Sequence, residues 1–317
     1  MKRPSLTRYA WLSIATAVLC LGLKGAAYLV TGSVGMLSDS LESLVNLGAS
    51  VMALSMLIVA ARPADEDHAY GHTKAEYFSS GAEGTLILVA AVGIAAAAVQ
   101  RLLRPQPIEE IGFGLLMGFV ASLLNLGTAM VLLKAGRKYN SITLEADAQH
   151  LLTDVWTTGA VLLGVGAAAL TSWHWLDPVA ALLMAANILR TGGGILKKSI
   201  SGLMDSALAR EDREKVRAIL QQYEGETMQF HALRTRQAGA RKFVSMHVLV
   251  PGTWTVQHGH ELLEQIEADI RQVLPDAAVF THLESLDDPT SYADATLERA
   301  NEPRHPKKSP PAPAESG

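Results

Sequence analysis

Two apolar segments of the chain each carry three polar residues at successive offsets of three and four positions. The two trios are Asp39, Glu42 and Asn46, and Asp147, His150 and Asp154. Such offsets place side chains on one face of an α-helix. If the two helices face each other, the last two members of each trio form one set of donors: Glu42, Asn46, His150 and Asp154. A set of four oxygen and imidazole donors suits a tetrahedral divalent metal ion.

Any one of these residues could instead be purely structural, because a lone intramembrane Asp or His often hydrogen-bonds between helices. The matched pair of trios favours a metal site over that alternative. Asp39 and Asp147 lie one turn nearer the start of each helix. We therefore expect these two to orient the ligands or to serve as groups at the start of each helix, and not to bind the ion.

Two further clusters, both of which contain several histidines, lie outside the apolar segments. Asp65, His68 and His72 stand together between the second and third segments, where two histidines four positions apart beside a carboxylate could bind a first-row metal. The alternative is an ordinary solvated charged loop. After Ser206 come five of the chain's ten histidines: His231, His247, His258, His260 and His282. Each alone would be taken as a surface residue, and it is their density that indicates metal binding.

Six segments are long and apolar enough to cross a membrane, which needs about 20 residues. They are Tyr9–Val30, Val34–Ala60, Tyr77–Gln100, Ile111–Leu133, Ile142–Leu170 and Leu176–Leu196. With the N-terminus in the cytoplasm, the cytoplasmic side receives Lys2, Arg3, Arg8, Arg62, Lys74, Lys134, Arg137, Lys138, Lys197 and Lys198. Only Arg101 and Arg104 fall on the other side, so the positive-inside rule predicts that both termini are cytoplasmic.

The region beyond Ser206 reads as a small soluble domain. The predicted elements are helix Arg210–Gln222, strands Met228–Arg236 and Lys242–Val250, helix His260–Val273 and strand Ala278–Glu284. The fold class is thus an all-α membrane bundle of six transmembrane helices plus a cytoplasmic α/β domain of ferredoxin-like αββαβ order. We divide the chain into a six-helix membrane domain (1–202), a cytoplasmic metal-binding domain (203–286) and a disordered tail (287–317).

Composition excludes several classes of protein. The single cysteine, Cys20, allows neither a disulfide framework nor a thiolate zinc cluster within one chain. The net charge of −4 averages two different regions and says little, but the lack of a strongly basic region argues against nucleic acid as a partner. An intramembrane aspartyl protease is disfavoured because the chain has no Gly-x-Gly-Asp sequence.

Several stretches resemble the cation diffusion facilitator family of metal–proton antiporters, in particular its bacterial ferrous-iron and zinc efflux members. They are Leu44–Ser50 (LVNLGAS), Arg62–Asp65 (RPAD), His68–Glu76 (HAYGHTKAE) and His231–Gly239 (HALRTRQAG). The resemblance implies that Glu42, Asn46, His150 and Asp154 are the transport site. Glu42 stands where the family has Asp or His, and Asn46 where it has Asp, so this site holds two negative charges instead of three when His150 is neutral.

The resemblance also assigns the other clusters. It implies a second metal site at Asp65, His68 and His72, and an ion pair between Lys74 and Asp205. It further implies a binuclear zinc site at a dimer interface, formed by His231, His247, His260, His282 and Glu284. His258 has no counterpart in this pattern.

These observations give one functional hypothesis and one alternative. The hypothesis is a proton-coupled antiporter that exports divalent transition-metal cations, zinc first and otherwise iron, cadmium, cobalt or manganese. It would reside in the bacterial cytoplasmic (inner) membrane as a homodimer joined through its cytoplasmic domain. Its partners would be metal ions, protons and the lipid bilayer, and it would have no prosthetic group and no enzyme activity. The alternative is a membrane metal sensor or receptor without transport activity.

Overall fold

The protein folds into two compact units. The computed structural model describes residues 5–31, 34–103, 113–171, 175–293 and 295–296, and their side chains except at 31, 34–39, 113–115, 160–171 and 176–177. The helical unit comprises Met1–Ala207 and Arg236–Lys242, and the C-terminal unit comprises Leu208–Thr235 and Phe243–Gly317.

The helical unit contains six long helices. They are α1 (Thr7–Thr31), α2 (Val34–Ala60), α3 (Ala75–Leu103), α4 (Phe113–Tyr139), α5 (Ile142–Thr171) and α6 (Leu176–Leu203). The six predicted segments are confirmed as helices, although α4 and α6 continue beyond Leu133 and Leu196 into charged residues. An apolar run marks only the part that contacts lipid, whereas backbone hydrogen bonds carry the helix further. Within the described residues, α1, α2, α3, α4 and α6 are long and apolar enough to cross a membrane.

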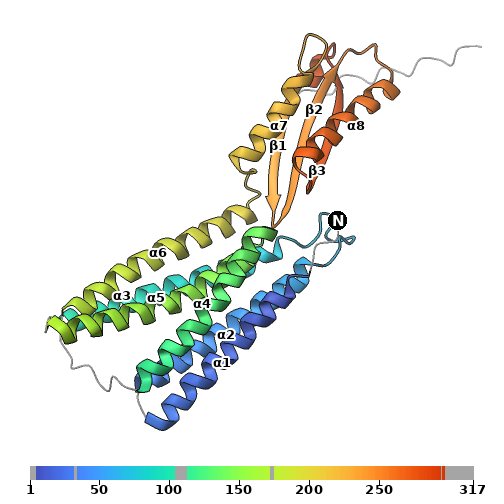
Figure 1. Cartoon of the computed structure of the whole chain (residues 1–317). Coiled ribbons are helices and arrows are strands. Elements are labelled where there is room, and N and C mark those ends of the chain that lie inside the picture. Colours follow the sequence, from blue (N-terminus) through green and yellow to red (C-terminus); the bar gives the residue numbers. More distant parts are fainter. Residues whose placement is uncertain (1–4, 32–33, 104–112, 172–174, 294, 297–317) are drawn as a thin grey trace, which may run out of the picture. The chain divides into compact units, whose positions relative to one another are not determined.

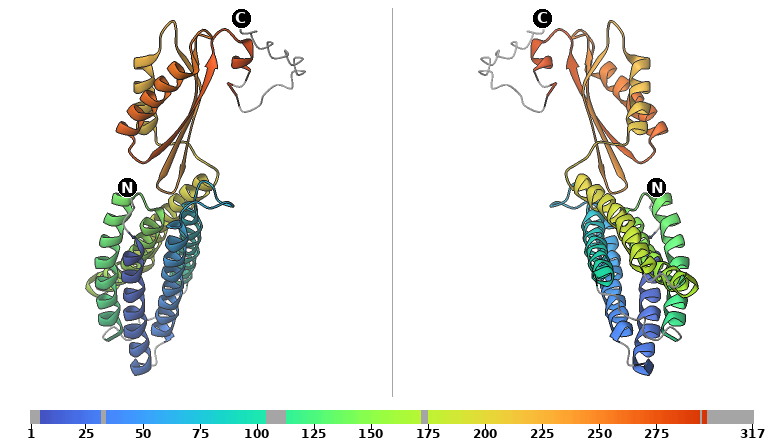
Figure 2. Two further views of the ribbon diagram at one scale, coloured as in Figure 1. Left: turned by 90° about the vertical axis from the view of Figure 1, so that its right-hand side faces the viewer. Right: turned by 90° about the vertical axis from the view of Figure 1, so that its left-hand side faces the viewer.

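α5 occupies the centre of the bundle, which is seen from three sides in Figures 1 and 2. It packs against all five of the other helices, and α3 packs most extensively against α6. α5 carries Glu145, Asp147, His150 and Asp154 in its first half. A central helix can hold such polar residues because its neighbours shield them from lipid.

Glycine allows α3 and α6 to approach closely. A Cβ atom added at Gly192 would lie 2.9 Å from Ile87 Cγ2, and one added at Gly84 would lie 3.1 Å from the backbone nitrogen of Leu196. Small residues at a helix contact are typical of membrane bundles, where close van der Waals packing replaces the hydrophobic effect. By contrast, Leu29, Val89 and Leu183 are largely exposed, as expected of side chains that face lipid.

The C-terminal unit is a three-stranded sheet with two helices packed on one face, as Figures 1 and 2 show. Its elements are α7 (Arg210–Tyr223), β1 (Gln229–Ala238), β2 (Arg241–Val250), α8 (Val256–Val273) and β3 (Ala277–Ser285), with the strands in the order β1-β2-β3. Val244, Met246 and Val248 of β2 alternate into a core that includes Val216 of α7 and Ile266 of α8. The predicted αββαβ order is therefore confirmed.

Regular structure continues past the predicted domain boundary at Asp287. A short helix, η1 (Pro289–Tyr292), begins where the Asp288 side chain accepts a hydrogen bond from the backbone N–H of Thr290 at 2.9 Å. Proline in the first turn suits a helix start because its missing N–H would have no partner there. The prediction of a tail without structure therefore needs correction at its beginning, and residues 297–317 lie outside the described residues.

Candidate metal sites

The structure brings three of the four predicted transport-site donors together between α2 and α5. The Asn46 amide donates to Asp154 Oδ2 at 2.6 Å, and Asn46 Oδ1 lies 2.6 Å from His150 Nε2. All three side chains are buried. The two helices thus face each other as the matched trios predicted.

One atom of this cluster has no hydrogen-bond partner. His150 Nδ1 is buried and makes no hydrogen bond with any described residue. An unpartnered nitrogen in a buried position is costly unless something binds it. A neutral imidazole beside a carboxylate is also the donor pair that first-row divalent metals favour. The donor set of this cluster therefore fits a divalent metal ion.

Glu42, the fourth predicted donor, lies one turn before Asn46 on α2. Its residue is exposed, unlike the other three, yet its carboxylate acts electrostatically on His150. A glutamate side chain is one methylene longer than the family's aspartate, so the carboxylate reaches further from its helix. Asp39 belongs to the residues whose side chains are not described.

Sequence reasoning missed one residue of this site. Asn125 of α4 donates to Asp154 Oδ2 at 3.0 Å, and its own Oδ1 accepts a hydrogen bond from the Cys20 thiol at 3.4 Å. Asn125 is an amide within the fourth apolar segment. The rule that polar residues inside a membrane span carry function could therefore have identified it.

The structure places the second predicted cluster, Asp65, His68 and His72, in the loop between α2 and α3. Asp65 Oδ1 lies 3.1 Å from His68 Nδ1, and Asp65 Oδ2 lies 3.3 Å from His72 Nε2. One ligand atom from each residue falls within 4.8 Å of the others. Gly71 makes the turn that returns His72 toward Asp65, with a φ of +82° that favours glycine.

The charge state of Asp65 also suits a metal ligand. Desolvation acts to raise the pKa of Asp65, but the backbone and side-chain hydrogen bonds from His68 and the charges of His72 and His68 outweigh it. The net result is a pKa below the ordinary value for aspartate. The carboxylate is thus ionised near neutral pH, as metal binding requires.

The ion pair implied between Lys74 and Asp205 is confirmed. Lys74 Nζ lies 2.9 Å from Asp205 Oδ1, and Arg236 Nη1 lies 3.1 Å from the same oxygen. Desolvation raises the pKa of Asp205, but the hydrogen bonds and charges of Lys74 and Arg236 lower it further, to below its ordinary value. All three residues belong to the helical unit, which includes the tip of the β1–β2 hairpin.

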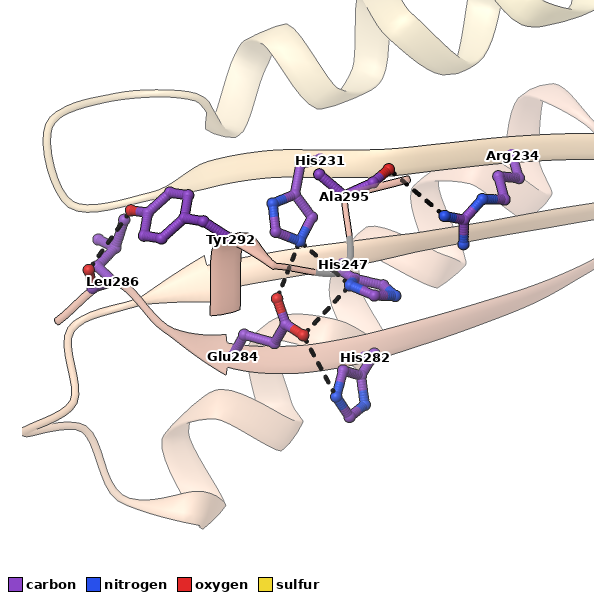
Figure 3. Close-up of polar contacts among 8 residues, drawn as sticks. All are labelled: His231, Arg234, His247, His282, Glu284, Leu286, Tyr292 and Ala295. Atoms are coloured by element: carbon purple, nitrogen blue, oxygen red, sulfur yellow. Dashed lines mark hydrogen bonds and ion pairs between the residues drawn. The ribbon is translucent and has the colours of Figure 1, made fainter. Parts of the chain in front are cut away.

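The third cluster lies on the sheet of the C-terminal unit (Figure 3). Glu284 of β3 is the shared partner: its Oε2 lies 2.9 Å from His231 Nε2 of β1, and its Oε1 lies 3.2 Å from His247 Nδ1 of β2. His282 is more exposed and lies 3.6 Å from Glu284 Oε1. Ala232, beside His231, has a φ of +51° inside β1. Such a local distortion can re-aim a neighbouring side chain.

The predicted ligand His260 does not join this cluster. It lies exposed on α8, and no contact between it and Glu284 is found among the described residues. His258, the unassigned histidine, packs its ring 4.1 Å from that of Trp254 at the start of the same helix. The assignment of His260 as a metal ligand therefore stays a prediction.

Comparisons with known proteins agree with this picture. The chain matches the model of the cation efflux transmembrane domain over residues 10–204 and that of the cation efflux cytoplasmic domain over residues 208–286. A Synechocystis relative, the uncharacterized transporter sll1263, is 47% identical over 304 residues, covering 96% of this chain and 94% of that protein. The cation-efflux pump FieF of Shewanella oneidensis is 30% identical over 270 residues, covering 85% of this chain and 90% of that protein.

Among solved structures, the metal-bound C-terminal domain of the CzcD transporter from Thermotoga maritima is 24% identical, covering 26% of this chain and 99% of that chain with a TM-score of 0.24. The fold and the family models together define an integral membrane transporter for cations. The chain belongs to the cation efflux family, which is the cation diffusion facilitator family that its motifs resemble. Members of this family are transporters and not enzymes.

Proposed function

We propose that this protein is a proton-coupled antiporter that exports divalent transition-metal ions from the cytoplasm across the bacterial inner membrane. The observation that carries the proposal is the buried contact of Asn46, His150 and Asp154 between α2 and α5, with His150 Nδ1 unpartnered. The relatives named cation-efflux pumps support efflux as the direction.

The donor set limits the substrate to divalent ions of the first transition row and similar metals. Glu42 and Asp154 supply two negative charges, which neutralise one divalent ion when His150 is neutral. Zinc is the first choice because imidazole and carboxylate in tetrahedral geometry suit it, while iron, cobalt, cadmium and manganese remain open.

Proton coupling follows from the chemistry of these ligands. A metal ion requires a neutral imidazole and ionised carboxylates, so its arrival displaces protons and its departure allows them to return. Histidine exchanges its proton near neutral pH at little cost. Access then alternates by movement of the bundle around the site. Protons that enter from outside would compete for His150 and Asp154 and expel the metal.

The other two clusters serve as structural or regulatory metal sites in this proposal. Asp65, His68 and His72 would hold one ion at the cytoplasmic loop. His231, His247, His282 and Glu284, with His260, would hold metal where two copies of the chain meet. Metal there would favour one arrangement of the homodimer.

The test is metal flux in vesicles containing the purified protein, driven by an imposed proton gradient, with a pH dye inside. We expect His150→Ala and Asp154→Asn to lose about tenfold or more of the flux, the scale on which ligand changes weaken metal sites. Asn187→Ala is the matched control, because Asn187 is a polar but exposed residue of α6. Parent-like flux in His150→Ala would refute the mechanism, and metal-dependent signalling without flux would identify the sensor alternative.

A further inference from the structure

Two amide groups from different helices bind the same oxygen of Asp154. The Asn46 amide of α2 donates to Asp154 Oδ2 at 2.6 Å, and the Asn125 amide of α4 donates to the same atom at 3.0 Å. All three side chains are buried. A carboxylate oxygen has two lone pairs and accepts one hydrogen bond with each. The two amides therefore use the whole accepting capacity of Oδ2.

The occupied Oδ2 limits how Asp154 can bind a metal ion. An ion at this site would be bound through Oδ1 alone, which makes Asp154 a monodentate ligand. Carboxylates that bind through both oxygens raise the coordination number, as they do in calcium sites. A carboxylate restricted to one oxygen favours a four-coordinate tetrahedral ion such as zinc over manganese, which prefers an octahedron of oxygens.

The orientation of the Asn125 amide is fixed from its other side by α1. The Cys20 thiol donates to Asn125 Oδ1, with a distance of 3.4 Å between Sγ and Oδ1. The same sulfur lies 3.7 Å from the backbone carbonyl oxygen of Ala121, one turn before Asn125 on α4. A flipped amide would bring Oδ1 against the carboxylate, where two acceptors would meet without a hydrogen between them. The thiol and the carboxylate thus require the same orientation of the amide.

A neighbouring polar contact shows what a link between α1 and α4 looks like when it does not reach the metal site. One turn beyond Asn125, Thr128 Oγ1 lies 2.7 Å from Thr16 Oγ1. Among the described residues, the hydrogen bonds found for these two side chains go to each other and to the backbone carbonyl of Leu12. Asn125 differs because it continues the contact between α1 and α4 to the carboxylate on α5.

We propose that Asn125, oriented by Cys20, is a positioning residue that keeps Asp154 Oδ2 away from the metal ion. Asp154 then makes a single bond to the ion, and the site prefers zinc and other tetrahedral divalent ions to manganese. The inference deepens the proposed function and rests on it for the effect on flux, though not for the effect on binding. Helices α1 and α4, which carry none of the predicted ligands, take part in selectivity in this way.

Transport of zinc and manganese tests the proposal. In vesicles that contain the purified full-length protein, kcat/KM is measured for each metal, and the parent should favour zinc. Asn125→Leu has a similar branched shape but no hydrogen-bonding atoms. It should lower the ratio of zinc to manganese by about tenfold, the scale on which partners that orient metal ligands act. Thr128→Val is the matched control, because Thr128 is buried on the same helix, and it should keep the parent ratio.

The ratio separates positioning from a purely structural role, which would reduce transport of both metals alike. An unchanged ratio in Asn125→Leu overturns the proposal even if both rates fall, and so does a parent that favours manganese. Cys20 provides a second test if Asn125→Leu does not fold. Cys20→Ala should lower the ratio, whereas Cys20→Ser keeps a donor for Asn125 Oδ1 and should keep the parent ratio. Equal ratios in the two Cys20 variants would also overturn the proposal.

Metal binding distinguishes this inference from the proposed transport. Zinc and manganese binding to the purified protein in detergent is compared between the parent and Asp154→Asn, and the difference belongs to this site. If Asn125→Leu removes about tenfold of the preference for zinc but the parent shows no flux in vesicles, the transport proposal fails while the inference stands. An unchanged preference in binding overturns the inference whether or not the parent moves metal.

Discussion

At the scale of single residues, the chemistry of the proposed transport site depends on Asn46. Its amide bridges His150 and Asp154 through two hydrogen bonds of 2.6 Å. A carboxylate at this position would add charge but could not donate to Asp154. The asparagine thus holds the metal-free site together at the expense of one potential anionic ligand.

The substitution Asn46→Asp should change metal preference. It gives the site a third carboxylate, which strengthens binding of divalent ions in general and removes the hydrogen bond to Asp154. We expect uptake into vesicles across a panel of zinc, iron, cobalt, cadmium and manganese to show a different order of rates from the parent. An identical order in both proteins would show that Asn46 does not set selectivity.

A second prediction concerns Asp205, whose pKa is lowered by Lys74 and Arg236 despite desolvation. Because the folded-state pKa lies below the unfolded value of about 3.9, the stabilising effect is complete above that pH and is lost as the pH falls through the folded pKa. Asp205→Asn should therefore lower the melting temperature at neutral pH, and the difference from the parent should shrink below about pH 4.

The asparagine variant is suitable because Asp205 has a φ of +57°, a conformation that asparagine also tolerates. Thermal unfolding in detergent over a pH series provides the measurement, with the exposed Asp276→Asn as the control. A difference that stays constant from neutral to acid pH would contradict this account of the ion pair.

At the scale of elements, the sequence predicted the helices well because apolar length is a strong signal. It also predicted that α2 and α5 face each other, since the trios share one spacing. It could not predict that α5 contacts all five other helices, because which helix is central depends on packing between segments far apart in the chain. Asn125 could have been noticed as an amide inside an apolar segment, but its contact with Asp154 could not be predicted, because that contact also depends on packing between distant segments.

Close packing of α3 on α6 gives a prediction at this scale. Gly192→Ala would place a Cβ atom 2.9 Å from Ile87 Cγ2, whereas a Cβ at the adjacent Gly193 meets nothing within 4 Å. We expect Gly192→Ala to destabilise the bundle by about 1–3 kcal/mol, as overpacking does. Gly193→Ala should unfold like the parent. Thermal unfolding of both variants tests this prediction. Equal melting temperatures would exclude a tight contact between α3 and α6 at Gly192.

At the scale of the whole molecule, each of the two units contains candidate metal sites of its own. The density of histidines predicted that the C-terminal unit contains a metal site. It could not predict which residue the others surround. In the structure Glu284 contacts His231, His247 and His282, while His260 lies apart. Strand order is what decides this arrangement, because β1, β2 and β3 present these residues side by side.

Glu284→Gln should therefore weaken metal binding to the C-terminal unit more than any single histidine change. In the full-length protein we expect bound zinc per chain to fall, and added zinc to raise the melting temperature less than in the parent, since a ligand stabilises only the state that binds it. His258→Ala should behave like the parent. Zinc content and zinc-induced stabilisation unchanged in Glu284→Gln would remove this residue from the site.

The asparagine at position 46 finally bears on how the transporter senses voltage. In the proposed antiport, a metal site with two carboxylates and a neutral imidazole would exchange one divalent ion for two protons without moving net charge. A third carboxylate at position 46 would raise this to three protons for each metal ion, so that one positive charge would move inward in each cycle. An interior-negative membrane potential would then assist efflux, by about 2.3 kcal/mol for every 100 mV across the bilayer, even when the pH is equal on both sides.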